Sequence, residues 1–268
     1  MTRKTHRLTV LGMSGVGKTT ISGILSDAGW VDYSCDYHIG SNYLKNEIIT
    51  DLISRFTCDP QIKPLIDNGT LEIHGRITND NLHLLSRFVG KIGNPEQEGL
   101  DYNEFRRRQN LYHMAEQEVV QNVSGALPDD PQIPFIHDSS GSLCELPEFL
   151  IKELAKSTRL VYIEATKEDE ELLLERARVY PKPLYYPPDF LDQALTDYMK
   201  ENALHYIALI DPDDFCRWVF PKLFYKRLPQ YKEMVDRYEG VTISSQDVKN
   251  IKSEQDFLEL ISRDQGSE

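Results

Sequence analysis

The clearest chemistry in the chain belongs to eight residues near its N-terminus. Gly12-Met13-Ser14-Gly15-Val16-Gly17-Lys18-Thr19 fits the pattern G-x-x-x-x-G-K-[ST], with a strand-like run before it and a helical pattern after it. Glycines let successive backbone N–H groups turn towards phosphate oxygens, and a helix N-terminus adds a positive partial charge. Lys18 is expected to reach the β- and γ-phosphates, and the Thr19 hydroxyl to bind Mg²⁺. The predicted nucleotide-binding residues are Gly12, Ser14, Gly15, Val16, Gly17, Lys18, Thr19 and Thr20.

Two aspartates follow other strand-like runs and are candidate metal and proton-transfer groups. Asp36 comes after Trp30–Ser34, and Asp138 comes after Ile133–His137. Ligands bind at the carboxyl ends of parallel strands, so both side chains are expected near the glycine-rich loop. A carboxylate there can hold Mg²⁺, directly or through water, or accept a proton from a hydroxyl. We therefore predict Thr19, Asp36 and Asp138 as metal ligands and Asp36 as the catalytic base.

Alternating strand and helix patterns indicate the fold class. Five short runs have β character, and helical pattern separates each from the next; they are Leu8–Leu11, Trp30–Ser34, Ile133–His137, Leu160–Ile163 and Val241–Ile243. Such alternation predicts an α/β fold, with a parallel sheet covered by helices on both faces. Near the C-terminal part, helical patterns predict two separate helices, at 213–225 and 229–238.

In its motif order the chain resembles the shikimate kinase and gluconate kinase branch of the nucleoside-kinase-like phosphate-loop proteins. After the loop and Asp36 come Phe105-Arg106-Arg107-Arg108-Gln109, the turn Ser139–Ser142, Glu175-Arg176-Ala177-Arg178 with Pro181-Lys182-Pro183-Leu184, and Arg227-Leu228-Pro229-Gln230-Tyr231. The resemblance implies a five-stranded sheet in the order 2-3-1-4-5.

The same resemblance implies roles for residues outside the loop. Arg106, Ser140, Gly141 and Arg227 would bind the acceptor of a phosphoryl group. Arg176, Arg178 and Lys182 would close over the phosphates from a lid and, with Lys18, Asp36 and Asp138, act in catalysis, because cations there stabilise charge on the transferred group. Gln109 stands where these kinases have Glu, and serines replace two turn glycines.

Two segments are much longer than the resemblance leads one to expect. We interpret residues 1–268 as a single kinase-like domain with helical insertions at 40–125 on the acceptor side and 181–228 on the lid side. Most of the additional sequence therefore falls where the acceptor and lid would lie. The insertions are also candidate surfaces for a second copy of the chain or a protein partner.

Composition limits the partners and the compartment. With 30 Lys and Arg against 43 Asp and Glu, the net charge is −13, which disfavours nucleic-acid binding. The four cysteines, at 35, 58, 144 and 216, have no metal-site spacing and are expected to be reduced thiols. No signal peptide or membrane-spanning run is recognised, so a cytoplasmic location without membrane contact is expected.

The sequence favours ATP- and Mg²⁺-dependent phosphoryl transfer to a small, anionic, hydroxyl-bearing acceptor. The alternative is a phosphate-loop ATPase or a nucleotide-dependent regulatory switch. A GTPase is a weaker alternative: Asp138–Gly141 fits D-x-x-G, and Thr166–Asp169 fits a variant of N-K-x-D. One helix and one strand fill the 24 residues between them, whereas GTPases have further elements there. Thr166–Asp169 is also typical of a helix start.

Overall fold

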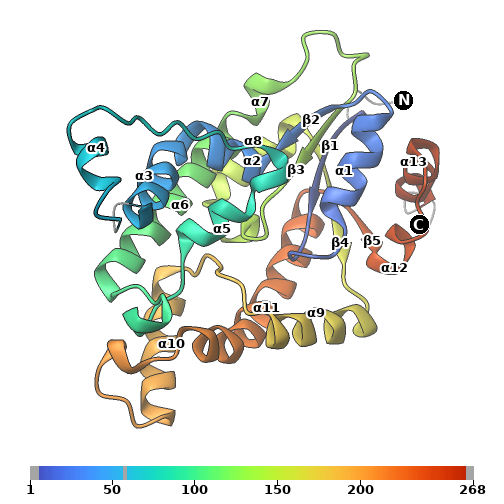
Figure 1. Ribbon diagram of the computed structural model, residues 1–268. Helices are drawn as coiled ribbons and strands as arrows, with labels where there is room; N and C mark the ends of the chain where they lie inside the picture. Colours follow the sequence, from blue (N-terminus) through green and yellow to red (C-terminus); the bar gives the residue numbers. More distant parts are fainter. Residues whose placement is uncertain (1–5, 57–58, 264–268) are drawn as a thin grey trace.

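A five-stranded parallel sheet forms the centre of the molecule. The computed structural model describes residues 6–56 and 59–263 (Figure 1). The strands are β1 (Arg7–Leu11), β2 (Val31–Ser34), β3 (Phe135–Asp138), β4 (Arg159–Glu164) and β5 (Val241–Ser244). Their order is β2-β3-β1-β4-β5, and every neighbouring pair is parallel. This confirms the predicted fold class and strand order.

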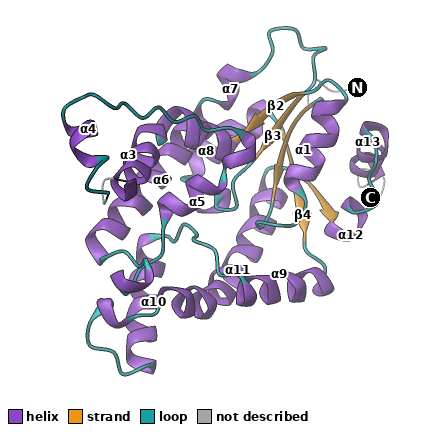
Figure 2. Ribbon diagram, viewed as in Figure 1, coloured by secondary structure: helices purple, strands orange, loops and turns teal. Residues whose placement is uncertain are grey.

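Helices cover both faces of the sheet (Figure 2). On one face, α1 (Lys18–Asp27) packs against β2 and β3, and α13 (Glu254–Arg263) packs against β5. On the other face, α8 (Glu148–Ser157) contacts β4, and α11 (Pro212–Arg237) contacts β4 and β5. The largest hydrophobic cluster lies between these layers, and the strands β1, β3 and β4 contribute almost wholly buried residues to it.

Between β2 and β3 the chain forms a helical region, which contains most of the segment 40–125. It holds α2 (Cys35–His38), a π-helical turn (Ile39–Tyr43), α3 (Lys45–Phe56), α4 (Lys63–Asp67), α5 (His83–Val89), α6 (Tyr102–Gln121) and α7 (Val123–Ala126). Residues of α2, the π-helical turn, α3, α5 and α6 form their own apolar cluster, in which Ile48, Phe88 and Val119 are buried. A second core therefore stands beside the sheet.

We call α9 (Lys167–Val179), α10 (Pro188–Glu201) and the first part of α11 the lid side, after the role that the sequence predicts for this part of the chain. A third apolar cluster joins α10 and α11 to Ile92 and Phe105 from the region between β2 and β3. Figure 1 shows α10 beneath the part of the chain that carries α5 and α6. The two long segments therefore share one core. After β5, the short helix α12 (Ser245–Val248) leads to α13.

The prediction of two helices at 213–225 and 229–238 is wrong. The structure has one helix of 26 residues, α11, with Pro221 and Pro229 inside it. Each proline removes one backbone donor, but buried side chains continue along the helix on both sides of the prolines. Packing of that continuous buried stripe against β4 and within the third apolar cluster outweighs the two lost hydrogen bonds.

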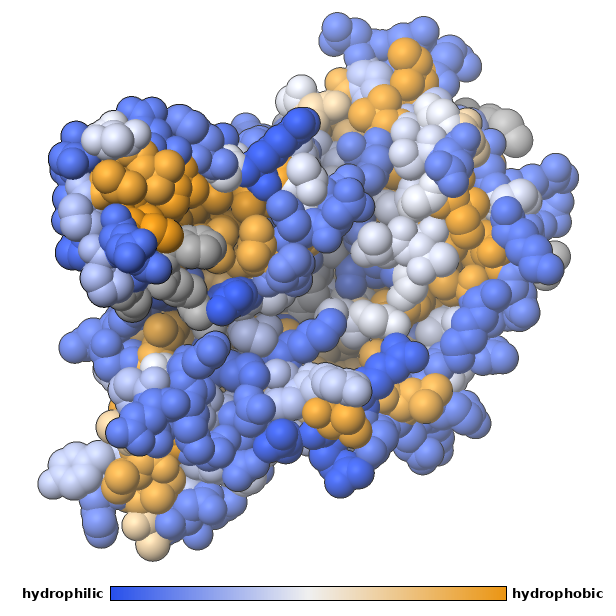
Figure 3. Space-filling view, in the orientation of Figure 1, coloured by the Kyte–Doolittle hydropathy of each residue, from blue (hydrophilic) through white to orange (hydrophobic). Residues whose placement is uncertain are grey.

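The structure also bears on the predictions about cysteines, membrane spans and interaction surfaces. Among the described cysteines, Cys35, Cys144 and Cys216 are free thiols, and Cys58 lies outside the described residues. In the described part of the chain, no helix is both long and apolar enough to cross a membrane. Figure 3 shows apolar surface over the α4 part of the molecule, where Leu65 and Leu71 are exposed. A partner at the insertions stays a prediction.

Candidate functional site

The glycine-rich loop connects β1 to α1 at the carboxyl edge of the sheet. Gly12 has a φ of +140°, and a Cβ there would lie 2.8 Å from the Ile163 carbonyl oxygen. Gly17, at the N-cap position of α1, has a φ of +108°, and a Cβ there would lie 2.8 Å from Val248 Cγ1. Only glycine fits these conformations without strain. The loop is thereby held close to β4 and α12.

The start of α1 provides donors without protein partners. Gly17 gives no side-chain cap, and in the described part of the chain no protein acceptor is found for the first backbone N–H groups, those of Lys18, Thr19 and Thr20. Orphan N–H groups at a helix N-terminus attract anions. The loop therefore fits a phosphate group, as the sequence motif predicts.

Lys18 lies beneath this loop and is buried. Its ammonium donates to the carbonyl oxygens of Gly12, at 2.9 Å, and Met13, at 3.2 Å. Burial lowers the pKa of Lys18, while the carboxylates of Asp138 and Asp36 oppose that shift. The cation is thus fixed at the loop, with two acidic groups near it.

Asp138 and Thr19 form the best candidate metal pair. The Thr19 hydroxyl donates to Asp138 Oδ2 at 2.8 Å. Burial raises the pKa of Asp138, whereas Lys18 and the bond from Thr19 lower it. A hydroxyl and a carboxylate beside a phosphate site are the oxygen ligands that Mg²⁺ takes, with water and phosphate completing its shell. These two residues fit the predicted ion.

Asp36 lies in the first turn of α2, two residues after the N-cap Ser34. The residue is exposed on the side of the cleft, while neighbouring protein desolvates its carboxylate. This desolvation, together with the nearby Asp138 carboxylate, raises the pKa of Asp36 to about 6, and Lys18 acts in the opposite direction. A carboxylate with such a pKa is mostly ionised at neutral pH and can still accept a proton.

These residues line a single cleft, which we call the main cleft, of about 470 Å³. Figure 3 shows the molecule hollowed between the α3–α5 part and the part that carries α1. Of the predicted site residues it collects Ser14, Gly15, Gly17, Lys18, Thr19, Thr20, Asp36, Asp138 and Gly141. Asp32, which accepts a hydrogen bond from Ser22, also lines it and was not predicted.

Two smaller cavities adjoin the main cleft. The inner cavity, of about 100 Å³, shares Ser14, Asp36 and Gly141 with it and extends to Tyr185 and Arg227. The side cavity, of about 270 Å³, shares Gly15, Gly17 and Thr20 with it and is also lined by Val16, Leu172, Arg176 and Lys249. The loop therefore has space on two sides, one reached past Asp36 and the other past Arg176.

Arg227 is brought to the inner cavity, but protein groups bind much of its guanidinium. Its Nη1 donates to the Gly141 carbonyl oxygen at 2.9 Å, and its Nη2 donates to the Tyr185 carbonyl oxygen at 2.9 Å. Its Nε lies 3.3 Å from Glu145 Oε1, and the residue is only 2% exposed. Arg227 therefore stabilises the wall of the inner cavity through the Gly141 and Tyr185 carbonyl groups.

The turn after β3 also uses its polar groups internally. The hydroxyls of Ser140 and Ser142 both donate to Glu116 Oε1, the latter at 2.7 Å. Glu116 is fully buried on α6, and no described protein group bonds its Oε2. Burial raises the pKa of Glu116 to about 7, against hydrogen bonds from the two serines that lower it.

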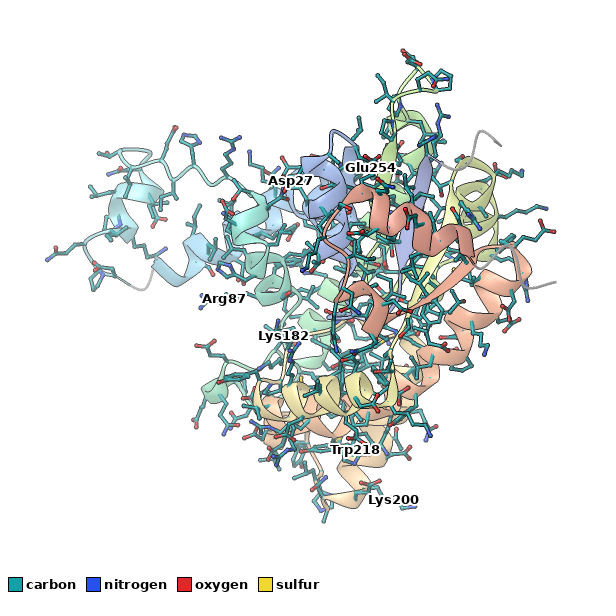
Figure 4. All side chains as sticks on the ribbon, turned by 90° about the vertical axis from the view of Figure 1, so that its right-hand side faces the viewer. Asp27, Arg87, Lys182, Lys200, Trp218 and Glu254 are labelled. Carbon is teal, nitrogen blue, oxygen red and sulfur yellow. The ribbon has the colours of Figure 1, made fainter. Side chains whose placement is uncertain are left out.

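Arg106 and two of the lid cations do not line the three cavities. Arg106, on α6, bonds Asp192 of α10 at 3.3 Å and the Pro188 carbonyl oxygen. Arg178 pairs with Glu175 at 2.7 Å on the exposed face of α9. Lys182 is exposed, and Figure 4 labels it on the segment beside α9. Of the predicted lid cations, Arg176 lines one of these three cavities, the side cavity.

Sequence reasoning missed Glu116, Glu145 and the position of Gln109. Gln109 Nε2 donates to the Leu184 carbonyl oxygen at 3.1 Å, and its Oε1 accepts from Tyr186 N–H at 2.8 Å. A signal for Glu116 was present, because it falls on the helical face of Phe105, Tyr112 and Val119, which is otherwise mostly apolar. An acid on such a face predicts a buried carboxyl. Glu145 lies in a short 3₁₀ turn and gave no comparable signal.

The segment Thr166–Asp169 begins a helix. Thr166 is the N-cap of α9, and its hydroxyl accepts from Asp169 N–H at 3.2 Å. The Asp169 carboxylate in turn binds the Ser245 hydroxyl and the Lys249 ammonium. Its acceptors are thus occupied by Ser245 of α12 and by Lys249, the C-cap residue of that helix. This agrees with the interpretation as a helix start.

Strand order and loop together define a phosphate-loop fold of the nucleoside-kinase-like type. No family model matches the chain, and no curated protein matches it. Among solved structures it is similar to a crystal structure of shikimate kinase from Bacteroides thetaiotaomicron. The match has 11% sequence identity and a TM-score of 0.44, and covers 96% of this chain and 94% of that one.

Proposed function

We propose that the protein transfers the γ-phosphoryl group of ATP to a hydroxyl of a small molecule, with Mg²⁺. The main support for the proposal is that three features adjoin one another in the main cleft and the inner cavity. The phosphate loop with Lys18 and Thr19, the carboxylate pair Asp36 and Asp138, and the inner cavity beyond Asp36 all meet there. A hydrolase or switch does not need this second cavity.

The residues divide the work between binding and proton transfer. The amides of the loop and Lys18 bind the phosphates, and Thr19 with Asp138 holds Mg²⁺, with Asp36 adding a carboxylate for a water ligand. When bound, Mg²⁺ neutralises phosphate charge. Asp36, between the loop and the inner cavity, accepts the proton of the acceptor hydroxyl as that oxygen attacks. The apolar walls of the inner cavity exclude water, which limits hydrolysis.

The proposal also assigns a site to the nucleotide base and a role to the lid cations. The side cavity, with Leu172 and Arg176 along one wall, is of a size and character that suits a purine ring and its ribose. Arg176, Arg178 and Lys182 lie on or beside α9 and would approach the phosphates as the lid closes. Arg178 would exchange its exposed partner Glu175 for phosphate, which costs little because exposed ion pairs are weak.

The first experiment measures ATP and GTP turnover with Mg²⁺, with and without a pool of small metabolites. We expect ATP turnover that requires the pool and leaves a phosphorylated metabolite. Steady turnover without the pool would instead favour the ATPase or switch, and preference for GTP would favour a GTPase.

Lys18→Ala provides the test of the loop. We expect at least a 100-fold loss of turnover, because the residue binds charge that develops in transfer, while the circular dichroism and melting transition stay those of a folded protein. Lys152→Ala, at an exposed position on α8, is the matched control and should keep full turnover. Full activity in Lys18→Ala would exclude the loop from the reaction.

A further inference from the structure

The inner cavity is where the proposed acceptor would bind, so its lining indicates the chemistry of that acceptor. Most of the lining is aliphatic or aromatic: it includes Leu82, Leu85, Val89, Tyr112, Tyr185 and Phe220. Asp36 and Ser14 lie where the cavity meets the main cleft. An acceptor there would expose one end to Asp36 and bury the rest against apolar side chains.

The wall formed by Pro183, Leu184 and Tyr185 is fixed in place. Gln109 bonds the carbonyl of Leu184 and the amide of Tyr186, and Arg227 bonds the carbonyl of Tyr185. The Tyr185 ring stacks on His113, with centroids 5.0 Å apart, and on Tyr112, at 5.8 Å. These contacts keep apolar surface facing the cavity.

Among the lining residues, the single cation is Arg227, and protein acceptors already bind much of its guanidinium. Glu145 lies 3.3 Å from its Nε and also pairs with Lys226 at 3.0 Å, so two cations share this carboxylate. Three of its nitrogen atoms donate to Glu145 and to two carbonyl oxygens. An anionic acceptor would therefore have to compete with Glu145 for this guanidinium.

Asp36 is the other charged residue in the lining, and the buried Glu116 lies beneath the Ser140–Ser142 turn. The Ser142 hydroxyl, which could otherwise bind a carboxylate, donates to Glu116 instead. A buried carboxylate that lacks a cation is strongly unfavourable, whereas an uncharged alcohol with an apolar body loses little.

We infer that the acceptor is an uncharged alcohol with a compact apolar body, held by apolar contacts with its hydroxyl at Asp36. The inference rests on the proposed kinase function and differs from the anionic acceptor that the sequence led us to expect. That expectation came from Arg106 and Arg227, and the structure directs the first to α10 and pairs the second with Glu145.

Matched pairs of alcohols test the inference directly. The protein is incubated with ATP and Mg²⁺ and either benzyl alcohol or its para-carboxylate, and either cyclohexanol or a hydroxycyclohexane carboxylate. Phosphorus NMR follows the formation of phosphate esters. We expect the neutral member of a pair to be phosphorylated at least ten times faster than the acid. Preference for the acids would overturn the inference while supporting the proposed kinase; ester formation from neither, with steady ATP hydrolysis, would overturn both.

A pair of variants gives a second test that works with any acceptor, including one from the metabolite pool. Ser86 lines the cavity and is exposed, so both Ser86→Asp and Ser86→Asn should fold. For an uncharged acceptor, the KM should change by less than about threefold between the two variants. For an anionic acceptor, the Asp variant should have a KM at least tenfold above that of the Asn variant, because like charges would face each other. That result would overturn the inference.

Discussion

Glu116 is a carboxyl group that sequence reasoning passed over and that the fold holds in an unusual state. It is fully buried, and one oxygen accepts from two serine hydroxyls while the other has no described partner. Burial raises its pKa from an ordinary 4.5 to about 7. At neutral pH, the protonated form is therefore well populated, and a proton on the second oxygen removes the cost of a buried charge.

The raised pKa of Glu116 predicts a pH-dependent contribution to stability. The folded state binds the proton more tightly than the unfolded state, so the contribution is complete below about pH 4.5 and is lost as pH rises through about 7. The wild-type free energy of unfolding should therefore fall between pH 5 and pH 8 by on the order of 2 kcal/mol more than that of Glu116→Gln, whose side chain is neutral at every pH. Urea unfolding at both pH values measures this.

The exposed Glu118→Gln variant on the same helix serves as the control for Glu116→Gln. Its unfolding free energy should follow that of the wild-type protein at both pH values. If Glu116→Gln also follows wild type, Glu116 is ionised in the folded protein and the argument from burial is wrong.

Asp36 leads to a prediction about activity. Its pKa of about 6 means that the ionised base is lost as the pH falls below that value. Acceptor-dependent turnover should therefore rise with pH through about 6 and then level off. Asp36→Asn should reduce turnover by 100-fold or more, since proton transfer by a positioned group contributes roughly that much.

Asp32→Asn is the matched variant for Asp36→Asn, because Asp32 also lines the main cleft, and burial and Asp138 raise its pKa too. It lies farther from the inner cavity, whose lining it does not join. Turnover by this variant should stay within about threefold of wild type. A larger loss in Asp32→Asn than in Asp36→Asn would assign the base to the other carboxylate.

Among the elements, strands were predictable and helix ends less so. All five strand-like runs became strands. The runs at β1, β3 and β4 are almost wholly buried, and buried apolar runs between helices have few other ways to pack. The loop and the aspartates after β2 and β3 followed from that topology, since parallel strands place their carboxyl ends together. The ion pairs of Arg106 and Arg227 could not be predicted in this way, because their partners, Asp192 and Glu145, come from distant parts of the chain.

The segment from Pro183 to Tyr186 depends on Gln109 for its position. Gln109 is 4% exposed and both donates to and accepts from that backbone. Gln109→Leu should lower the free energy of unfolding by about 1–3 kcal/mol, because buried backbone groups lose their partner. It should also raise the KM of the acceptor several-fold more than that of ATP, because the displaced wall belongs to the inner cavity. Urea unfolding and initial rates measure the two effects.

Asn110→Ala, at an exposed position one residue further along α6, is the control for Gln109→Leu. It should alter neither the stability nor either KM appreciably. A Gln109→Leu protein with an unchanged acceptor KM would show that the wall is held by other contacts.

For the whole molecule, the important feature is the core shared by the two long segments. Ile92 and Phe105 from the region between β2 and β3 pack with Leu191, Phe215 and other residues of the lid side. The Asn94 amide also donates to the Ile210 carbonyl oxygen at 2.8 Å. A lid built in this way is expected to move together with the acceptor side. Neither segment alone has a pattern that reveals this, because the contact joins residues more than 80 positions apart.

Phe105→Ala tests this coupling. Removing a fully buried Phe costs roughly 3–5 kcal/mol and leaves a cavity between the two segments. Amide exchange should then accelerate in α10 and in the first half of α6 together, while β1, β3 and β4 keep their protection. Leu154→Ala, in the core beneath the sheet, is the matched control. It should be destabilised without that shared acceleration. Faster exchange in α6 with unchanged α10 would mean that the lid side is stable by itself and opens independently of the acceptor side.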